Sequence, residues 1–145
     1  MEILNRQVNH NYFVTDTYET GIVLTGTEIK SIRAGKCNIK DSYAILKNNE
    51  IYLLNAHISQ YDKGNIFNHE ETRTRKLLLH KNEILKLNNK VNIEGYTLIP
   101  LKIYFVRGRA KVLLGVCKGK KTYDKKQALK EHDLDREMMK NTKFR

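Results

Sequence analysis

The side chains that could bind a metal or act as nucleophiles are few, and they are scattered along the chain. The five histidines form no H-x-x-x-H pair with a nearby acidic residue, which excludes a helix of the metalloprotease type: His10, His57, His69, His80 and His132. His69-Glu70-Glu71 stands in a polar segment without further ligands and is interpreted as solvated surface. Cys37 and Cys117 lie far apart within apolar stretches, where a free cysteine behaves as a small hydrophobic residue. We therefore expect no metal, no cofactor and no enzymatic activity.

The charge balance indicates what the protein binds. The chain of 145 residues has a formal net charge of +11, from 27 Lys and Arg against 16 Asp and Glu. An excess of this size indicates a polyanionic partner, either nucleic acid or an anionic membrane surface. No run of about 18 apolar residues occurs, and the N-terminal residues are too polar for a signal peptide. The sequence therefore favours a cytoplasmic protein that binds nucleic acid and no membrane.

Basic residues cluster at two places where they could reach phosphate groups. The first cluster is the string RTRK over residues 73–76, and the second comprises Arg107, Arg109 and Lys111 around a predicted hairpin tip. Phosphate contacts need only charge within reach, and several of them dominate affinity through counterion release. Tyr61 and Tyr123 lie in polar surroundings and could stack on bases. Core packing is favoured for the other aromatic residues.

The elements that would position these residues are mostly strands. Residues 11–24 are rich in β-branched and aromatic types and predict one long strand or two short ones, with Gly21 as a possible bulge. Thr25 and Glu28 have the spacing of a capping box, so a short helix is expected over residues 27–34. Two hairpins are expected, with strands at 42–47 and 50–55, and at 96–106 and 110–117.

Between the two hairpins the pattern is less decisive. Residues 59–72 form a polar loop, and residues 73–87 combine three consecutive leucines with helical spacing. Whether residues 77–79 belong to a strand or to the helix that follows is left open by the periodicity. Pro100, the only proline, lies within a predicted strand and indicates an edge or a bend there.

This order of elements predicts a mainly β fold with small helices. Five or six short strands favour an OB-like antiparallel β-barrel over residues 1–117, with a β-sandwich as the alternative. Residues 118–145 hold 10 basic and 5 acidic residues and only a thin apolar stripe. We expect this basic tail to be disordered alone and helical on a polyanion, the alternative being a helix docked on the barrel.

Six strings resemble a known family when they are taken in order and spacing. They are YETGIVLTGTEIKSIRAGK (18–36), HIS-x-Y (57–61), GN-x-x-NHE (64–70), RTRKLLLHKNEI (73–84), EGYTLIPLKIYF (94–105) and GKKTYDKK (119–126). Together they resemble the small protein B family, the SsrA-binding proteins of bacterial trans-translation. The resemblance runs from about Asn5 to the C-terminus. A nonspecific single-strand binder of the OB type or a ribosomal protein is the alternative from another class.

The resemblance implies a specific function. Members of this family bind the tRNA-like domain of transfer-messenger RNA (tmRNA, SsrA RNA) and carry it to stalled ribosomes as monomers. The protein stands where a tRNA anticodon arm would, and its tail occupies the empty mRNA channel beyond the decoding centre of the small subunit. The ribosome is then rescued and the stalled peptide is tagged for degradation.

The resemblance also implies site residues. Positions tied to tmRNA binding fall on four residues: Asn5, Glu19, Leu78 and Lys111. The tail motif that is expected to reach the decoding centre falls on seven: Gly119, Lys120, Lys121, Tyr123, Asp124, Lys125 and Lys126. Tyr123 stands where the family often has His, and Lys126 stands where Arg is more usual, which removes a planar bidentate donor.

Overall fold

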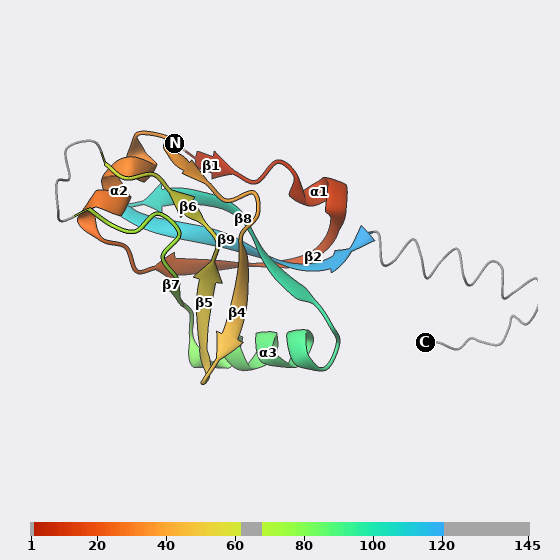
Figure 1. The fold of residues 1–145 in the computed structure, drawn as a ribbon. Helices are drawn as coiled ribbons and strands as arrows, with labels where there is room; N and C mark the ends of the chain where they lie inside the picture. The colour runs from red at the N-terminus through yellow and green to blue at the C-terminus, as the bar shows by residue number, and fades with distance from the viewer. Residues whose placement is uncertain (1, 62–67, 121–145) are drawn as a thin grey trace, which may run out of the picture.

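The computed structural model describes residues 2–61 and 68–120, and most of these residues lie in strands (Figure 1). The elements in chain order are β1 (Glu2–Leu4), α1 (Val8–Asn11), β2 (Tyr12–Ile22), α2 (Gly26–Arg33), β3 (Cys37–Asn38), β4 (Tyr43–Lys47), β5 (Glu50–Leu54), β6 (His57–Ile58), β7 (Arg75–Leu78), α3 (Lys81–Asn92), β8 (Thr97–Val106) and β9 (Arg109–Gly119). The mainly β prediction is confirmed.

The large sheet closes on itself, so the fold is a barrel rather than a sandwich. Its strand order is β1-β8-β4-β5-β7-β2-β9, and an additional pairing joins β9 back to β8. Every pairing is antiparallel, which agrees with the expected OB-like antiparallel barrel. One edge of β8 pairs with β9. The other edge pairs with β4 near the start of β8 and with β1 near the end of β8.

Both predicted hairpins are present, and their turns follow from residue type. Asn48 and Asn49 connect β4 to β5 with φ of 53° and 64°, the left-handed conformation that Asn tolerates. Arg107 and Gly108 connect β8 to β9 with φ of 52° and 80°. The second strand runs to Gly119, two residues beyond the expected end of the barrel.

The predicted helix forms almost where it was expected. Thr25 is the N-cap of α2: its side chain accepts from the Glu28 N–H, and Glu28 in turn accepts from the Thr25 N–H. Gly35 follows the helix with φ of 77°, as a helix stop requires. In the segment left open by the periodicity, residues 75–78 form β7, and α3 begins only at Lys81.

Two irregularities bend the long strands. The register of β8 against β9 shifts between Pro100 and Lys102, which confirms the bend expected at the proline. The register of β2 against β9 shifts between Val14 and Asp16, whereas Gly21 pairs regularly, so the bulge suggested at Gly21 is wrong in position.

One main core fills the barrel, and α3 covers its lower end (Figure 1). Ile84 and Leu87 of α3 are buried in this core together with Ile32 of α2. Successive side chains of a strand alternate between the core and the outside, which decides which residues reach the outer surface.

Candidate nucleic-acid interface

Leu78 lies on the outside of the barrel. In β7 the side chains of Arg75 and Leu77 are buried, while that of Leu78 is 50% exposed. A leucine in a row of three would ordinarily be assigned to the core, yet strand alternation turns this one toward solvent. The structure therefore places Leu78 where a partner can contact it.

Gly21 brings Leu78 and Lys111 into one row across three strands. Strand β2 lies between β7 and β9, and Gly21 is paired with Leu78 on one side and with Lys111 on the other. A Cβ atom at Gly21 would lie 3.2 Å from Leu78 Cβ and 3.3 Å from its Cδ1. Because Gly21 has no side chain, Leu78 can pack over the β2 backbone on the side of the sheet that also carries Lys111.

Glu19 joins the same surface and is held there by Tyr104. Residues 19 and 21 point to the same side of β2, and the Tyr104 hydroxyl donates a hydrogen bond to Glu19 Oε2 across the intervening strand β9. Burial and then the hydrogen bond to Glu19 raise the pKa of Tyr104 to about 12, so this phenol remains a donor throughout the neutral range. We refer to Glu19, Gly21, Leu78, Tyr104 and Lys111 as the β2–β9 surface.

A groove runs beside this surface. It has a volume of about 340 Å³ and is lined by residues 21–24, Ile29, Leu78 and residues 108–111. Aliphatic side chains form much of its lining, and Arg109 and Lys111 add two cationic groups. Arg107 and Arg109 are exposed at the hairpin tip, as the second basic cluster predicted. This combination can hold a base on apolar atoms and its phosphate on the cations.

Asn5 lies apart from the β2–β9 surface. Its side chain is only 6% exposed, and Nδ2 donates to the carbonyl oxygens of Ile39 at 3.3 Å and Pro100 at 3.0 Å. Its backbone N–H donates to the Leu101 carbonyl oxygen at 2.9 Å. Asn5 therefore fastens the segment after β1 to the bulge of β8, and of the four predicted tmRNA-binding residues only the other three come together.

Two residues of the tail motif fall within the described part of the chain. Gly119 ends β9 opposite Tyr12. The Lys120 ammonium donates to the Asn9 carbonyl oxygen at 2.6 Å and lies 4.9 Å from the centroid of the Phe13 ring. The remaining motif residues lie outside the described residues: Lys121, Tyr123, Asp124, Lys125 and Lys126.

The cations of the first basic cluster, RTRK, pair with carboxylates of the protein itself. The side chain of Arg75 is 0% exposed, and it donates to Glu28 Oε2 at 2.7 Å and to the Ala56 carbonyl oxygen at 2.7 Å. Arg73 bonds the other oxygen of Glu28 at 2.7 Å, and Lys76 pairs with Glu50 at 2.9 Å. These cations are occupied by protein acceptors. The carboxylate that holds the two arginines is more than 40 residues away in sequence, so the string itself carried no signal of it.

His69 is also placed differently from the prediction. It was interpreted as solvated surface, yet it is 5% exposed. Its Nε2 lies 2.8 Å from the Ile58 carbonyl oxygen, and its Nδ1 lies 2.9 Å from Thr27 Oγ1. Nε2–H therefore donates to the carbonyl, and Nδ1 accepts from the threonine hydroxyl. The buried ring links the segment around residue 69 to α2 and β6.

Sequence reasoning missed two features of the interface. Tyr104 received no role, although it holds Glu19 from 85 residues away, and the proximity of Gly21 to Leu78 depends on strand register. Neither feature could be read without the pairing of the strands.

An aromatic ring with two cations lies near the end of β9, where the ammonium groups of Lys90 and Lys118 lie 5.4 and 4.8 Å from the Tyr96 ring centroid.

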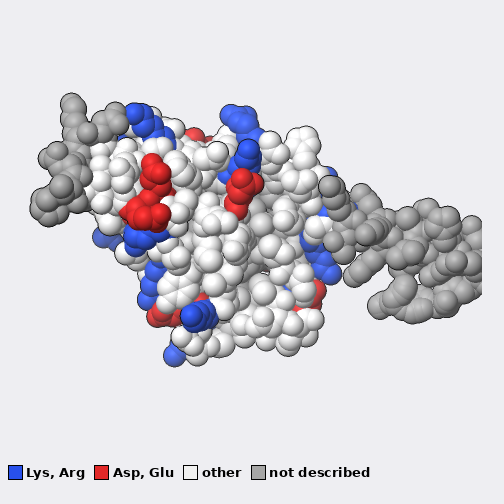
Figure 2. Space-filling model, in the orientation of Figure 1, with Lys and Arg blue, Asp and Glu red and all other residues white. Residues whose placement is uncertain are grey.

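Charge is distributed in small groups over the face drawn in Figure 2, where Lys and Arg lie next to Asp and Glu around a broad uncharged area. Among residues 2–61 and 68–120, no group of three or more His, Cys, Asp or Glu is placed to hold a metal ion. No helix in these two ranges is long and apolar enough to cross a membrane.

Comparison with known proteins identifies the relatives of this chain. The family profile described as SmpB protein matches residues 2–144. The chain is 55% identical to the SsrA-binding protein of Shouchella clausii, over 97% of this chain and 90% of that protein. It is 56% identical to the SsrA-binding protein of Staphylococcus aureus strain Newman, over 97% of this chain and 92% of the relative. Neither description names a catalytic activity.

A solved structure agrees with these relatives. The chain superimposes with a TM-score of 0.71 and 48% identity on a chain from the structure described as "tmRNA-SmpB: a journey to the center of the bacterial ribosome". The superposition covers 88% of this chain and 94% of the solved one. A family match over nearly all residues, together with relatives above half identity and a shared barrel, leads to one conclusion: this chain is a member of the SmpB family.

Proposed function

We propose that this protein is the RNA-binding adaptor of trans-translation. It binds the tRNA-like domain of tmRNA with the β2–β9 surface and delivers this RNA to stalled ribosomes in the cytoplasm. It acts by binding alone and catalyses no reaction. The observation that carries the assignment of the surface is the row of Leu78, Gly21 and Lys111 across three neighbouring strands.

The chemistry of the surface suits a folded RNA with exposed bases. The half-exposed Leu78 offers an apolar contact for a base that has left its stack, and Lys111 lies in the same row for the adjoining phosphate. Glu19 supplies an acceptor for base N–H or ribose hydroxyl groups, and the Tyr104 hydrogen bond fixes its direction. A carboxylate on a protein of charge +11 favours specific contacts over uniform attraction to phosphate.

The tail, residues 118–145, is proposed to enter the empty mRNA channel of the small subunit and to place its basic motif at the decoding centre. Strand β9 carries the chain from the hairpin tip near Lys111 to the start of this tail at the other end of the barrel. The β2–β9 surface and the start of the tail therefore lie at opposite ends of one strand.

A matched pair of leucines tests the RNA surface. Leu78 and Leu85 are equally exposed, at 50% and 51%, but Leu85 lies on α3 and does not line the groove beside the β2–β9 surface. We expect Leu78→Ala to weaken binding of the tRNA-like domain by about tenfold, the scale of one lost base contact, and Leu85→Ala to leave it unchanged. Equal effects of the two variants would contradict the assignment, and so would a wild-type affinity no greater than that for a size-matched hairpin at the same salt.

Deletion of residues 119–145 tests the division of roles. The shortened chain should bind the tRNA-like domain nearly as well as the full chain, but peptide tagging on stalled ribosomes should be lost. A collapse of RNA affinity on deletion, or normal tagging without the tail, would contradict the proposal. Affinity that grows with strand length and ignores RNA shape would favour the nonspecific single-strand binder instead.

A further inference from the structure

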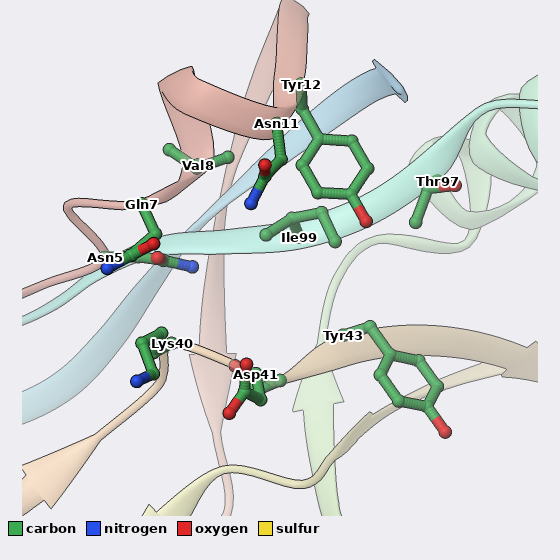
Figure 3. A pocket seen from close by; sticks show the side chains of 11 residues that line it. Asn5, Gln7, Val8, Asn11, Tyr12, Lys40, Asp41, Tyr43, Thr97 and Ile99 are labelled. Atoms are coloured by element: carbon green, nitrogen blue, oxygen red, sulfur yellow. The ribbon is translucent and has the colours of Figure 1, made fainter. Parts of the chain in front are cut away.

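A second concave site lies near the other end of β2 (Figure 3). It is a cavity of about 260 Å³ between the segment that leads into β2 and the segment that leads into β4. Figure 3 shows Asn11 and Tyr12 on one side, Asp41 and Tyr43 on the other, and Ile99 of β8 between them. None of the β2–β9 surface residues lines it.

The cavity has the lining of a site for a small planar polar molecule. Val8 and Ile99 are buried and form an apolar wall, and Tyr12 and Tyr43 belong to the same packed cluster. Amide, hydroxyl and charged groups complete the lining: Asn5, Gln7, Asn11, Lys40, Asp41, Ser42 and Thr97. Sites for drug-sized ligands have roughly 300–1,000 Å³, so this cavity suits a smaller group such as one nucleobase.

Asn5 adds a second and independent observation. Its Nδ2 donates to two carbonyl oxygens, which fixes the orientation of the amide, because the flipped amide would set its oxygen against both. Asn5 Oδ1 is consequently turned away from them, and it is buried with no hydrogen-bond partner. Buried acceptors are almost always paired, so this oxygen lacks an N–H donor. Asn5 itself lines the cavity, so this oxygen belongs to a side chain that a bound ligand would meet.

We propose that this cavity binds a single unstacked base of the RNA partner, whose N–H group donates to Asn5 Oδ1 while its ring lies against Tyr43. The inference rests on the proposed function, since it takes the tRNA-like RNA to be the partner. Every RNA base carries at least one N–H donor, so Asn5 selects for a base without specifying which. Lys40 lies at the same cavity and can meet the phosphate that follows the base.

The position of the cavity sets the size of the RNA. Tyr12 lines it, while Gly21, nine residues along β2, belongs to the β2–β9 surface. At about 3.3 Å per residue of strand, the two contacts are roughly 30 Å apart. A single nucleotide or dinucleotide cannot reach both sites, whereas a folded RNA can present two unstacked bases at this spacing.

The test combines protein variants with removal of single bases. Abasic nucleotides are placed one at a time through the loops of the tRNA-like domain, and binding is measured to the wild type, Tyr43→Ala, Tyr43→Phe and Asn11→Trp. Tyr43→Phe keeps the ring and is the matched control. Asn11 is exposed, so its replacement by Trp fills the mouth of the cavity without removing core atoms. Thermal unfolding of each variant reports any loss of the fold.

We expect one abasic position to weaken wild-type and Tyr43→Phe binding by about tenfold and to have almost no further effect in Tyr43→Ala or Asn11→Trp. If every abasic position weakens the wild type and the folded Asn11→Trp variant by the same factor, no base occupies the cavity and the inference is wrong. In that case Leu78→Ala still weakens binding and the proposed function stands. If the wild type shows no preference for the tRNA-like domain, both fail.

Discussion

Removing the negative charge of Glu28 should destabilise the protein more than removing any exposed carboxylate. The carboxylate of Glu28 accepts hydrogen bonds from Arg73 Nη2 at 2.7 Å, from Arg75 Nε at 2.7 Å and from the Thr25 N–H at 2.8 Å. Both Glu28 and Arg75 are 0% exposed. Glu28→Gln keeps the size of the side chain but leaves the guanidinium of Arg75 buried without its counter-charge.

The magnitude follows from this burial. Breaking a buried ion pair by neutralising one partner costs about 3–5 kcal/mol. That is a large share of the roughly 5–15 kcal/mol by which a domain of this kind is stable. For a chain of this length it corresponds to a fall of about 10–15 °C in Tm.

Glu50→Gln is the matched control, because Glu50 forms an ion pair with Lys76 in which both side chains are 42% exposed. Solvent and side-chain entropy weaken such surface pairs, so this variant should unfold close to the wild type. Urea and thermal unfolding of the three proteins, followed by circular dichroism, provide the measurement. If Glu28→Gln and Glu50→Gln lose the same small amount of stability, the buried cluster does not hold the fold as argued.

The pH dependence of folding stability tests the role of Glu28 in a second way. Burial would raise the pKa of Glu28, but the hydrogen bonds from Arg73, the Thr25 backbone and Arg75 outweigh it and hold the pKa below its ordinary value of 4.5. A depressed pKa adds stability above the unfolded-state value, and this contribution is lost as the pH falls through the folded-state pKa. The stability gap between wild type and Glu28→Gln should therefore be full at pH 7 and narrow once the pH drops below about 4.5. A gap that widens in acid would refute the reasoning.

Three further predictions concern the thiols, the positioning of Glu19 and salt. Burial raises the pKa of Cys37 to about 12 and that of Cys117 to about 11, so neither thiol should react with iodoacetamide at pH 8 until urea unfolds the protein, as mass spectrometry will show. Tyr104→Phe should weaken binding of the tRNA-like domain as much as Glu19→Ala, with no further loss in the double variant and no fall in Tm. Tyr52→Phe, which also removes a hydrogen bond from a tyrosine hydroxyl to a glutamate, should leave the affinity unchanged. Affinity should drop by roughly a thousandfold between 50 and 200 mM salt if six or more phosphates are neutralised, and a flat salt profile in the binding assay would exclude a phosphate-dominated interface.

The parts of the fold that the sequence predicted are those set by neighbouring residues. Asn48-Asn49 determines a tight turn, and the pair Thr25 and Glu28 determines a helix start, because the interacting groups are only a few positions apart. The barrel was predicted from the number of short strands and their spacing along the chain. The short strand β1 and the four-residue α1 were missed, because segments of this length carry no periodicity.

The candidate site was less predictable, because it depends on which strands lie side by side. Nothing local distinguishes the exposed Leu78 from the buried Leu77, and only strand alternation places them on opposite sides. Arg75 looked like a free cation because its acceptor, Glu28, is 47 residues away. The family resemblance supplied Glu19, Leu78 and Lys111 in advance, and the structure adds the register that brings them together.

The path of β9 has a mechanical consequence. The strand is bonded on both edges along almost its whole length, to β2 through residues 111–119 and to β8 through residues 109–117. Lys111 lies near its beginning, and the tail leaves from its end. Under the proposed function, tension on the tail while the RNA holds Glu19 on β2 and Leu78 on β7 would run parallel to β9 and pass to its neighbouring strands. The load is then shared by many interstrand bonds in shear, rather than opening them one after another, so the barrel can serve as a stiff tether between RNA and ribosome.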